Sequence, residues 1–256
     1  MKKSLIKGFV FPLLLLALWN ILAASGVWSA DLLPSPGAIF CSALELFQSG
    51  VLLKHLLISL ARVIGGFLLA CLTALPLAVW VGSKPDLSPW FSPIFRFFHH
   101  APPLIFFPIL LLWLGISETA ILFMVVIASF FPIFFNSKNG IRNTDYRLIE
   151  VGKSLGLSKQ KILTKIALPG AFPAIARGMR IGMNYSWCIL IGAEMLAPSS
   201  GLGSLIFDTS QPARSDAIIV GVLTIAILGT LIDLLFQRAS QDWLPWSQEA
   251  IYDERN

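Results

Sequence analysis

Two features of this sequence carry residue types that could do chemistry. The first, Gly152-Lys153-Ser154, matches the end of a phosphate-binding loop, in which main-chain amides and a lysine hold the phosphates of a nucleotide. The complete motif G-x-x-x-x-G-K-[ST] needs a glycine at position 147, which is Arg147 here. We therefore predict that this chain binds no nucleotide through a P-loop.

The second feature is an acidic residue, Glu194, inside the apolar stretch 181–198. An ionisable group within a membrane span costs about 2.5–3.5 kcal/mol and usually faces protein or a water-filled cavity. We therefore predict that Glu194, with Met195 and Tyr185, lies beside a solute pathway. It is equally open that the span ends near Cys188 and that Glu194 lies outside it or forms a structural pair.

Other catalytic or metal-binding patterns are missing from the sequence. The three cysteines, Cys41, Cys71 and Cys188, have none of the paired spacings that zinc sites, redox couples or disulfide frameworks use. No arrangement of Ser, His and Asp suggests hydrolysis within a membrane. We predict no catalytic residue, no metal site and no cofactor bound by this chain, so an intramembrane enzyme is the least favoured class.

Composition sets the kind of element that must position these residues. Of the 256 residues, 56% are hydrophobic and only 13% are charged, and the mean hydropathy is +0.77. Soluble domains carry about twice that share of charged residues. A helix that spans a bilayer needs about 20 predominantly apolar residues. We therefore expect an all-α integral membrane protein with the lipid bilayer as its surroundings.

Six stretches of the sequence are apolar enough to be spanning helices. Four contain no charged residue: 8–30, 63–83, 97–117 and 119–137. Two more, 181–198 and 217–236, contain one acidic residue each, Glu194 and Asp233. Arg62 and Asp233 lie near predicted helix ends, where they can reach the headgroups or form structural ion pairs.

The basic residues indicate how these spans are threaded. Most of the 19 Lys and Arg residues fall on one side of the predicted spans, and only Lys54 and Arg214 fall clearly on the other. Cytoplasmic loops retain Lys and Arg, so both termini are predicted to be cytoplasmic. This distribution also explains the net charge of +5 without nucleic acid as a partner.

The first apolar stretch has a competing interpretation as a cleaved signal peptide. Its basic start and the small residues 23–25 are typical of one, but the apolar run continues through Trp28, which favours an uncleaved helix. On the predicted outer side, the turn signal 34–37 precedes apolar residues spaced as on a helix. We predict a short amphipathic helix within 31–55, on the outer surface.

The predicted cytoplasmic loop 137–180 is long, polar and basic. Apolar residues at Leu148, Ile149, Val151 and Leu155 predict one face of a helix over 146–155, which Gly156 would end as a left-handed cap. Ser158 can then cap a second helix that stops before Pro169. The loop is therefore predicted to be a rigid helix–turn–helix on which another protein docks.

This loop resembles the signature of the binding-protein-dependent transport permeases, the membrane subunits of ABC importers. That signature reads Glu-Ala-Ala, then a downstream Gly, then Ile-x-Leu-Pro. The chain supplies Glu150, Val151 and Gly152, then Gly156, and then Ile166, Leu168 and Pro169. Val151 and Gly152 depart from the two alanines but are also small.

The resemblance extends over most of the chain. It includes Leu33-Pro-Ser-Pro-Gly37, Ser59-Leu-Ala-Arg-Val63, Ala101-Pro-Pro-Leu104, Trp113-Leu-Gly-Ile116, Ala193-Glu-Met195 and Gly201-Leu-Gly203, with Pro173, Gly178 and Arg180 after the loop. In these positions the chain looks like the nitrate, sulfonate and taurine branch.

The resemblance implies an architecture and a set of partners. The fold would be the type I ABC importer permease, or MetI-like, fold with six transmembrane helices in the bacterial inner membrane. Residues 1–57 would be a first transmembrane helix and an external segment, 58–240 the permease core, and 241–256 a cytoplasmic tail. Partners would be a second permease copy in a homodimer, two ATP-binding cassette subunits that hold ATP and magnesium, and an extracytoplasmic solute-binding protein.

The resemblance also implies which residues couple transport to ATP hydrolysis. A coupling loop at about 137–180 would seat in a cleft of the ATPase subunit and transmit its closure, so that the permease imports a small anionic solute by alternating access. The residues it assigns to this role are Glu150, Val151, Gly152, Ser154, Leu155, Gly156, Leu157, Ile166, Leu168 and Pro169. The alternative is a secondary transporter or channel without an ATPase partner.

Overall fold

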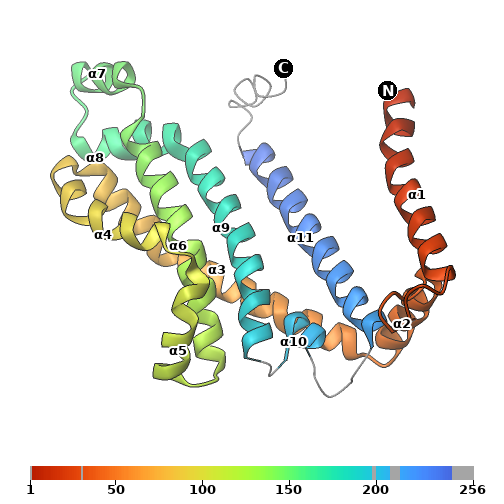
Figure 1. The fold of residues 1–256 in the computed structure, drawn as a ribbon. Coiled ribbons are helices and arrows are strands. Elements are labelled where there is room, and N and C mark those ends of the chain that lie inside the picture. Colours follow the sequence, from red (N-terminus) through yellow and green to blue (C-terminus); the bar gives the residue numbers. More distant parts are fainter. Residues whose placement is uncertain (1, 30, 198–199, 208–213, 244–256) are drawn as a thin grey trace. The chain divides into compact units, whose positions relative to one another are not determined.

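The computed structural model describes residues 2–29, 31–197, 200–207 and 214–243 (Figure 1). All regular structure in these residues is helical, which confirms the predicted all-α class. By contacts between residues the chain forms two compact units, Met1–Ser59 with Glu194–Ile227, and Leu60–Ala193 with Leu228–Asn256. Most of the predicted tail 241–256 lies outside the described residues.

The first unit contains three complete helices and the beginnings of two longer ones. Trp19 donates a hydrogen bond from Nε1 to the carbonyl oxygen of Pro34 at 3.1 Å, and Ser35 caps the second helix by accepting from the amide of Ala38. The unit's helices are α1 (Lys2–Ala24), α2 (Pro36–Gln48) and α10 (Leu202–Phe207), with the first residues of α3 (Val51–Ser83) and α11 (Ser215–Trp243).

The predicted amphipathic helix on the outer surface corresponds to α2. It buries Ile39 and Leu46 against Val220 and leaves the large apolar side chains of Phe40 and Phe47 exposed. The helix lies within the predicted segment 31–55: α2 stops at Gln48, and α3 begins at Val51. Gly50, with φ of +75°, makes the break, since a left-handed residue cannot continue either helix.

The second unit holds most of α3 and the helices that follow it. α6 carries Glu118 at its first turn, capped by Ser117, which accepts from the amide of Ala120. The remaining elements are η1 (Pro85–Leu87), α4 (Ser88–His100), η2 (Pro103–Phe106), α5 (Phe107–Leu114), α6 (Glu118–Arg142), α7 (Tyr146–Ser154), α8 (Lys159–Ile162), η3 (Leu163–Ala167) and α9 (Leu168–Leu196).

Three helices in the described residues are long and apolar enough to cross a membrane, Val51–Ser83, Glu118–Arg142 and Ser215–Ser240. Shorter apolar helices cover Val10–Ala24 and Pro103–Leu114. The predicted multi-pass membrane fold is therefore confirmed, while the number six stays a prediction. The predicted fifth span lies in α9, which is long enough but also carries two arginines and Glu194.

The predicted third span, 97–117, is not one helix. α4 ends at His100, Ala101 is extended with ψ of 127°, and a 3-10 turn from Pro103 leads into α5, which is only eight residues long. Proline disfavours the helical conformation of the residue before it and has no amide hydrogen to donate. The pair Pro102-Pro103 therefore breaks the apolar run into two helices.

Helices α6 and α9 approach one another closely within the second unit. A Cβ atom added to Gly178 would lie 2.7 Å from Asn136 Cβ, and one added to Gly182 would lie 3.1 Å from the carbonyl oxygen of Ser129. On α6, a Cβ atom at Gly140 would lie 2.6 Å from Ala174 Cβ. Small residues let transmembrane backbones pack against each other, and here they hold α9 on α6.

Candidate functional site

The loop between α6 and α9 is folded as a helix, a glycine turn and a second helix. Asp145 caps α7 by accepting from the amide of Arg147 at 2.9 Å. At the other end, the amide of Gly156 donates to the carbonyl oxygen of Lys153, and the amide of Leu157 donates to that of Gly152. Gly156 has a φ of +71°. This is the Schellman ending that the glycine predicted.

Gly152 is needed where α7 packs on the following segment. It is buried, and an added Cβ atom would lie 2.6 Å from Ile166 Cδ1 and 3.4 Å from Ile162 Cγ1. From the sequence, Gly152 was a small departure from an alanine in the signature. The structure shows that it lets α7 approach Ile166, so Gly152 and Ile166 from the two parts of the signature meet.

A face of α7 next to the one that carries Gly152 exposes apolar side chains. Leu148, Val151 and Leu155 are 52%, 57% and 74% exposed, and their spacing of three and four residues places them on one side of the helix. We call these three residues the α7 stripe. Exposed apolar stripes of this kind mark surfaces where another protein docks.

The polar edge of α7 is held by contacts within the helix. The Glu150 carboxyl group accepts from the hydroxyl of Tyr146, and this raises the pKa of the Tyr146 phenol. Lys153 Nζ lies 5.8 Å from the centre of the Tyr146 ring, within range of a cation–π contact. The first contact spans about one helical turn and the second about two, and both leave the α7 stripe uncovered.

The second helix of the loop differs from the prediction at its far end. Ser158 caps it as expected, accepting from the amide of Lys161 at 3.3 Å. However, the helix does not stop before Pro169: α8 passes through the π-helical turn η3 directly into α9. Pro169 follows this wider turn, which changes the pattern of main-chain hydrogen bonds where the proline has no amide hydrogen to donate.

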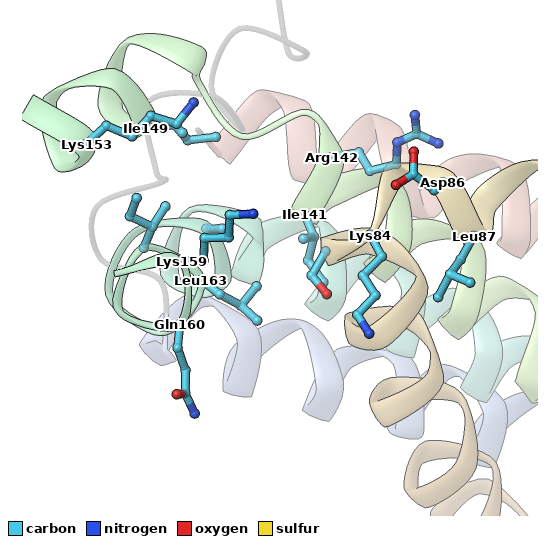
Figure 2. A pocket seen from close by; sticks show the side chains of 14 residues that line it. Lys84, Asp86, Leu87, Ile141, Arg142, Ile149, Lys153, Lys159, Gln160 and Leu163 are labelled. Atoms are coloured by element: carbon cyan, nitrogen blue, oxygen red, sulfur yellow. The ribbon is translucent and has the colours of Figure 1, made fainter. Parts of the chain in front are cut away.

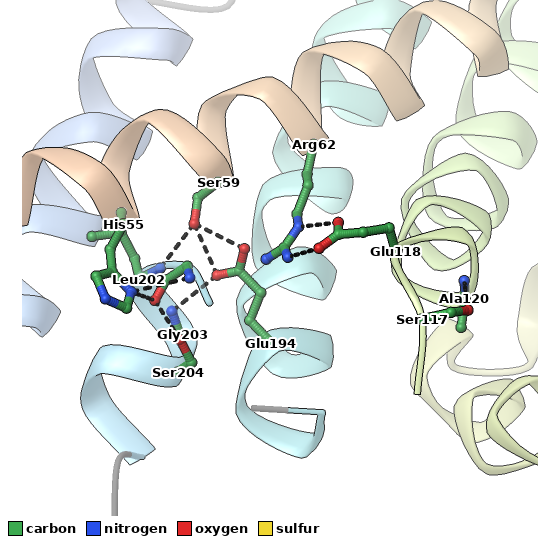
Figure 3. A network of polar contacts seen from close by, with 11 residues as sticks. His55, Ser59, Arg62, Ser117, Glu118, Ala120, Glu194, Leu202, Gly203 and Ser204 are labelled. Carbon is green, nitrogen blue, oxygen red and sulfur yellow. Dashed lines mark hydrogen bonds and ion pairs between the residues drawn. The ribbon is translucent and has the colours of Figure 1, made fainter. Parts of the chain in front are cut away.

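Glu194 lies in the first unit and is fully buried. Its carboxyl oxygens both lie 2.9 Å from the hydroxyl of Ser59, and one accepts from the amide of Gly203 at 3.0 Å (Figure 3). Ser59 in turn accepts from the amide of Leu202 at 2.9 Å. The acidic side chain therefore holds the first turn of α10 against the beginning of α3.

Gly201, which directly precedes α10, has both its carbonyl and its amide group in contact with one side chain. His55 Nδ1 lies 2.7 Å from its carbonyl oxygen and 3.1 Å from its amide nitrogen. Its φ is +110°, and an added Cβ atom would lie 2.2 Å from the Glu194 carboxyl carbon. The sequence pointed to Glu194 and to the Gly-Leu-Gly run separately, but nothing in it indicated His55.

Of the other predicted pathway residues, Tyr185 is half exposed on α9 and Met195 is partly buried beside Glu194 in sequence. Their place beside a solute pathway stays a prediction.

Arg62 and Asp233 form the structural ion pairs that the sequence left open. Arg62 is buried on α3 and donates from Nε to Glu118 at 2.7 Å, with a second bond from Nη2 to the same carboxylate (Figure 3). Arg180 on α9 donates two bonds of 2.7 Å to Asp233 on α11, which also accepts from Asn184. Bidentate pairs of this kind fix the relative rotation of two helices.

Reversing one member of the Arg180 and Asp233 pair should destabilise the protein, and reversing both should restore it. Because both side chains are partly exposed, we expect Asp233→Arg alone to cost about 1–2 kcal/mol. The double variant Arg180→Asp, Asp233→Arg should recover most of that loss. Melting temperatures in mild detergent measure both, and a double variant no better than the singles would show that the pair does not join α9 to α11.

The chain is similar to known membrane transport proteins over most of its length. The family described as binding-protein-dependent transport system inner membrane component matches residues 66–243. A Bacillus subtilis protein named as an aliphatic sulfonates transport permease, SsuC, is 32% identical over 94% of this chain and 87% of its own. The Escherichia coli taurine transport system permease protein TauC is 29% identical over 92% of this chain and 87% of its own.

A solved structure shares the fold. A chain of the MetNI methionine ABC transporter, in an inward-facing conformation, superposes with a TM-score of 0.63 at 18% identity. The match covers 72% of this chain and 92% of the other. The predicted MetI-like architecture is therefore confirmed at the level of the fold.

Proposed function

Because the chain belongs to the binding-protein-dependent transport system inner membrane component family, we propose that it is a permease subunit that imports a small anionic solute. It is a transport subunit of the ABC type and not an enzyme, since in this family ATP hydrolysis lies on separate subunits. The sulfonate and taurine permeases among its relatives support a sulfonate, taurine or nitrate-like anion as the solute.

The observation that carries the proposal is the α7 stripe. Three large apolar side chains stand exposed on α7 and at its C-cap, and the same helix packs on Ile162 and Ile166 through Gly152. Because α7 contacts Ile166 of η3, a displacement of α7 would move η3. η3 continues directly into α9, so α9 would move with it. We therefore assign the stripe as the surface that docks on the ATP-binding cassette subunit.

The proposed assembly follows from this docking. Two copies of the chain would form a homodimer, and each copy would present one α7 to one ATPase subunit, where ATP and magnesium bind. A solute-binding protein on the outer side would deliver the solute. With the loop on the cytoplasmic side, closure of the ATPase subunits would switch the permease between its inward-facing and outward-facing packings in the bacterial inner membrane.

The three residues predicted to lie beside the solute pathway are proposed to have two different roles. Glu194 is proposed to shape the pathway by positioning α10, because its oxygens are engaged by Ser59 and Gly203. Tyr185 and Met195, which hold no such contacts, are kept as candidates for touching the solute.

Leu155→Asp tests the docking surface. Leu155 is 74% exposed, so the charge should leave the permease folded but place a carboxylate in an apolar contact. We expect the affinity for the ATPase subunit to fall about 30-fold or more, as for a central interface residue. The measurement is a pull-down of the tagged chain from its native membranes in mild detergent, with mass spectrometry of what co-purifies.

Asn143→Asp is the matched control, since it adds the same charge at an exposed position of the same loop outside α7. A stoichiometric ATPase that is retained by this control and lost with Leu155→Asp would support the importer. If no ATPase accompanies even the unaltered chain, the secondary transporter or channel becomes the better reading.

A further inference from the structure

A second surface of the same loop carries four basic side chains around a cleft of about 890 Å³. Lys84 lies at the end of α3, Lys153 on α7 and Lys159 on α8, with Arg142 at the end of α6 (Figure 2). Asp86 is the one acidic residue among the lining residues of the described chain. We call this the basic cleft, and its charge favours an anionic ligand.

The basic cleft lies where two apolar helices end. Ser83 is the last residue of α3 and Arg142 the last of α6, and both helices are long and apolar enough to cross the membrane. The ends of such helices lie at the level of the lipid phosphates. A ligand in the cleft would therefore share its depth with the headgroups of one leaflet.

A second cavity is apolar, and several of its lining residues are next in sequence to residues of the cleft. It has a volume of about 850 Å³, and its lining belongs to α3, η3 and α9: Leu75, Val79, Thr164, Leu168, Pro169, Phe172 and Ile175. We call it the apolar groove. Leu75 and Val79 lie further inside the apolar helix α3 than Gly82, which is next to its end.

The same helices line both cavities. On α3, Leu75 and Val79 line the groove and Gly82 lines the cleft, at spacings of four and three residues that fall on one helical face. On η3, Leu163 lines the cleft and its neighbour Thr164 lines the groove. One elongated molecule with an anionic head and an apolar tail would fill both.

We propose that the basic cleft and the apolar groove together bind an anionic phospholipid, with its phosphate among Lys84, Lys153 and Lys159 and one acyl chain along Leu75 and Val79. Basic pockets between transmembrane helices at the cytoplasmic surface are suited to such headgroups. The inference goes beyond the proposed function and uses only the predicted orientation, in which this loop is cytoplasmic and the lipid belongs to the inner leaflet.

The lipid would not compete with the ATPase subunit. Lys153 lies on α7 and Leu155 is its C-cap, two residues further on, so at about 100° per residue their side chains point to nearly opposite sides of the helix. The headgroup would therefore contact the inner side of α7 while the α7 stripe faces outward. A bound lipid would support α7 from the side that transmits its movement to α9.

The test is lipid retention by the purified chain. Native mass spectrometry, on protein stripped of lipid and titrated with phosphatidylglycerol or cardiolipin, measures how many molecules bind. Because two cationic contacts are lost, Lys84→Gln with Lys159→Gln should weaken binding about 30-fold. Lys161→Gln with Lys165→Gln, which removes two exposed lysines that do not line the cleft, should leave binding unchanged.

A variant of the groove separates a lipid from a soluble phosphate. Thr164→Trp fills the groove and should weaken lipid binding without affecting inorganic phosphate, while Thr164→Val removes only the hydroxyl and should change neither. Binding of inorganic phosphate that prevents lipid binding while Thr164→Trp has no effect would overturn the proposal in favour of a free anion.

Two other outcomes would also overturn it. One is equal lipid retention by the cleft and control variants. The other is loss of the ATPase subunit with Lys84→Gln and Lys159→Gln at unchanged lipid retention, which would make the cleft part of the docking surface. Lipid retention is measured on the permease chain itself. Its result therefore does not depend on which solute is transported or on whether an ATPase subunit co-purifies.

Discussion

Gly178→Leu should cost the folded protein at least about 3 kcal/mol, because no side chain fits between α6 and α9 at this position. A Cβ atom there would lie 2.7 Å from Asn136 Cβ, 3.1 Å from the carbonyl oxygen of Pro132 and 3.4 Å from Ile133 Cα. The last two are main-chain atoms, so the neighbour cannot turn aside and the helices must separate. Thermal melting and size-exclusion profiles in mild detergent measure the loss.

The control for this prediction is Gly65→Leu. Gly65 also lies inside a long helix, α3, but an added Cβ atom meets only Leu122 Cδ2, at 4.0 Å. This variant should melt close to the unaltered protein, since it gains helix propensity and meets no backbone. If both variants had the same melting temperature, the close approach of α9 to α6 would not limit stability.

The sequence predicted the long apolar helices well because hydrophobicity and length decide whether a segment spans a membrane. α6 occupies the stretch predicted from the run 119–137, and α11 that from 217–236. The third run was mispredicted because its hydrophobicity is uniform, whereas its conformation depends on two residues, Pro102 and Pro103. Hydrophobicity alone does not register a break in the backbone.

Local sequence signals in the loop between α6 and α9 were also sufficient to predict where its helices end and begin. Gly156 and Ser158 ended one helix and began the next at the predicted places, because both act on their own neighbours in sequence. The close packing at Gly152 could not be predicted, since it depends on Ile166, fourteen positions away and on another element. The family signature held both residues but did not say that they touch.

The contacts of Glu194 lie furthest from what the sequence could predict. Ser59 is 135 residues away in the chain, and its hydroxyl is one of several that could have faced an acidic group. The cost of a carboxyl group in an apolar stretch predicted that Glu194 has a partner. It did not identify the partner, because that pairing is decided only when the beginning of α3 packs on the end of α9.

Glu194→Ala should destabilise the first unit strongly. It removes the acceptor of the Ser59 hydroxyl and the Gly203 amide, two buried donors whose loss of a partner costs about 1–3 kcal/mol each. We expect a loss of about 4 kcal/mol, and faster hydrogen exchange of the amides of α10, measured by mass spectrometry of its peptides.

Glu194→Gln separates the positioning role from contact with the solute. The glutamine keeps one carbonyl oxygen that accepts from Gly203, so α10 should stay protected and stability should largely recover. If Glu194 positions α10, transport in proteoliposomes should recover together with stability, because the charge itself is not used. If transport is lost while α10 stays protected, the negative charge acts on the solute or its pathway, and the positioning role alone is insufficient.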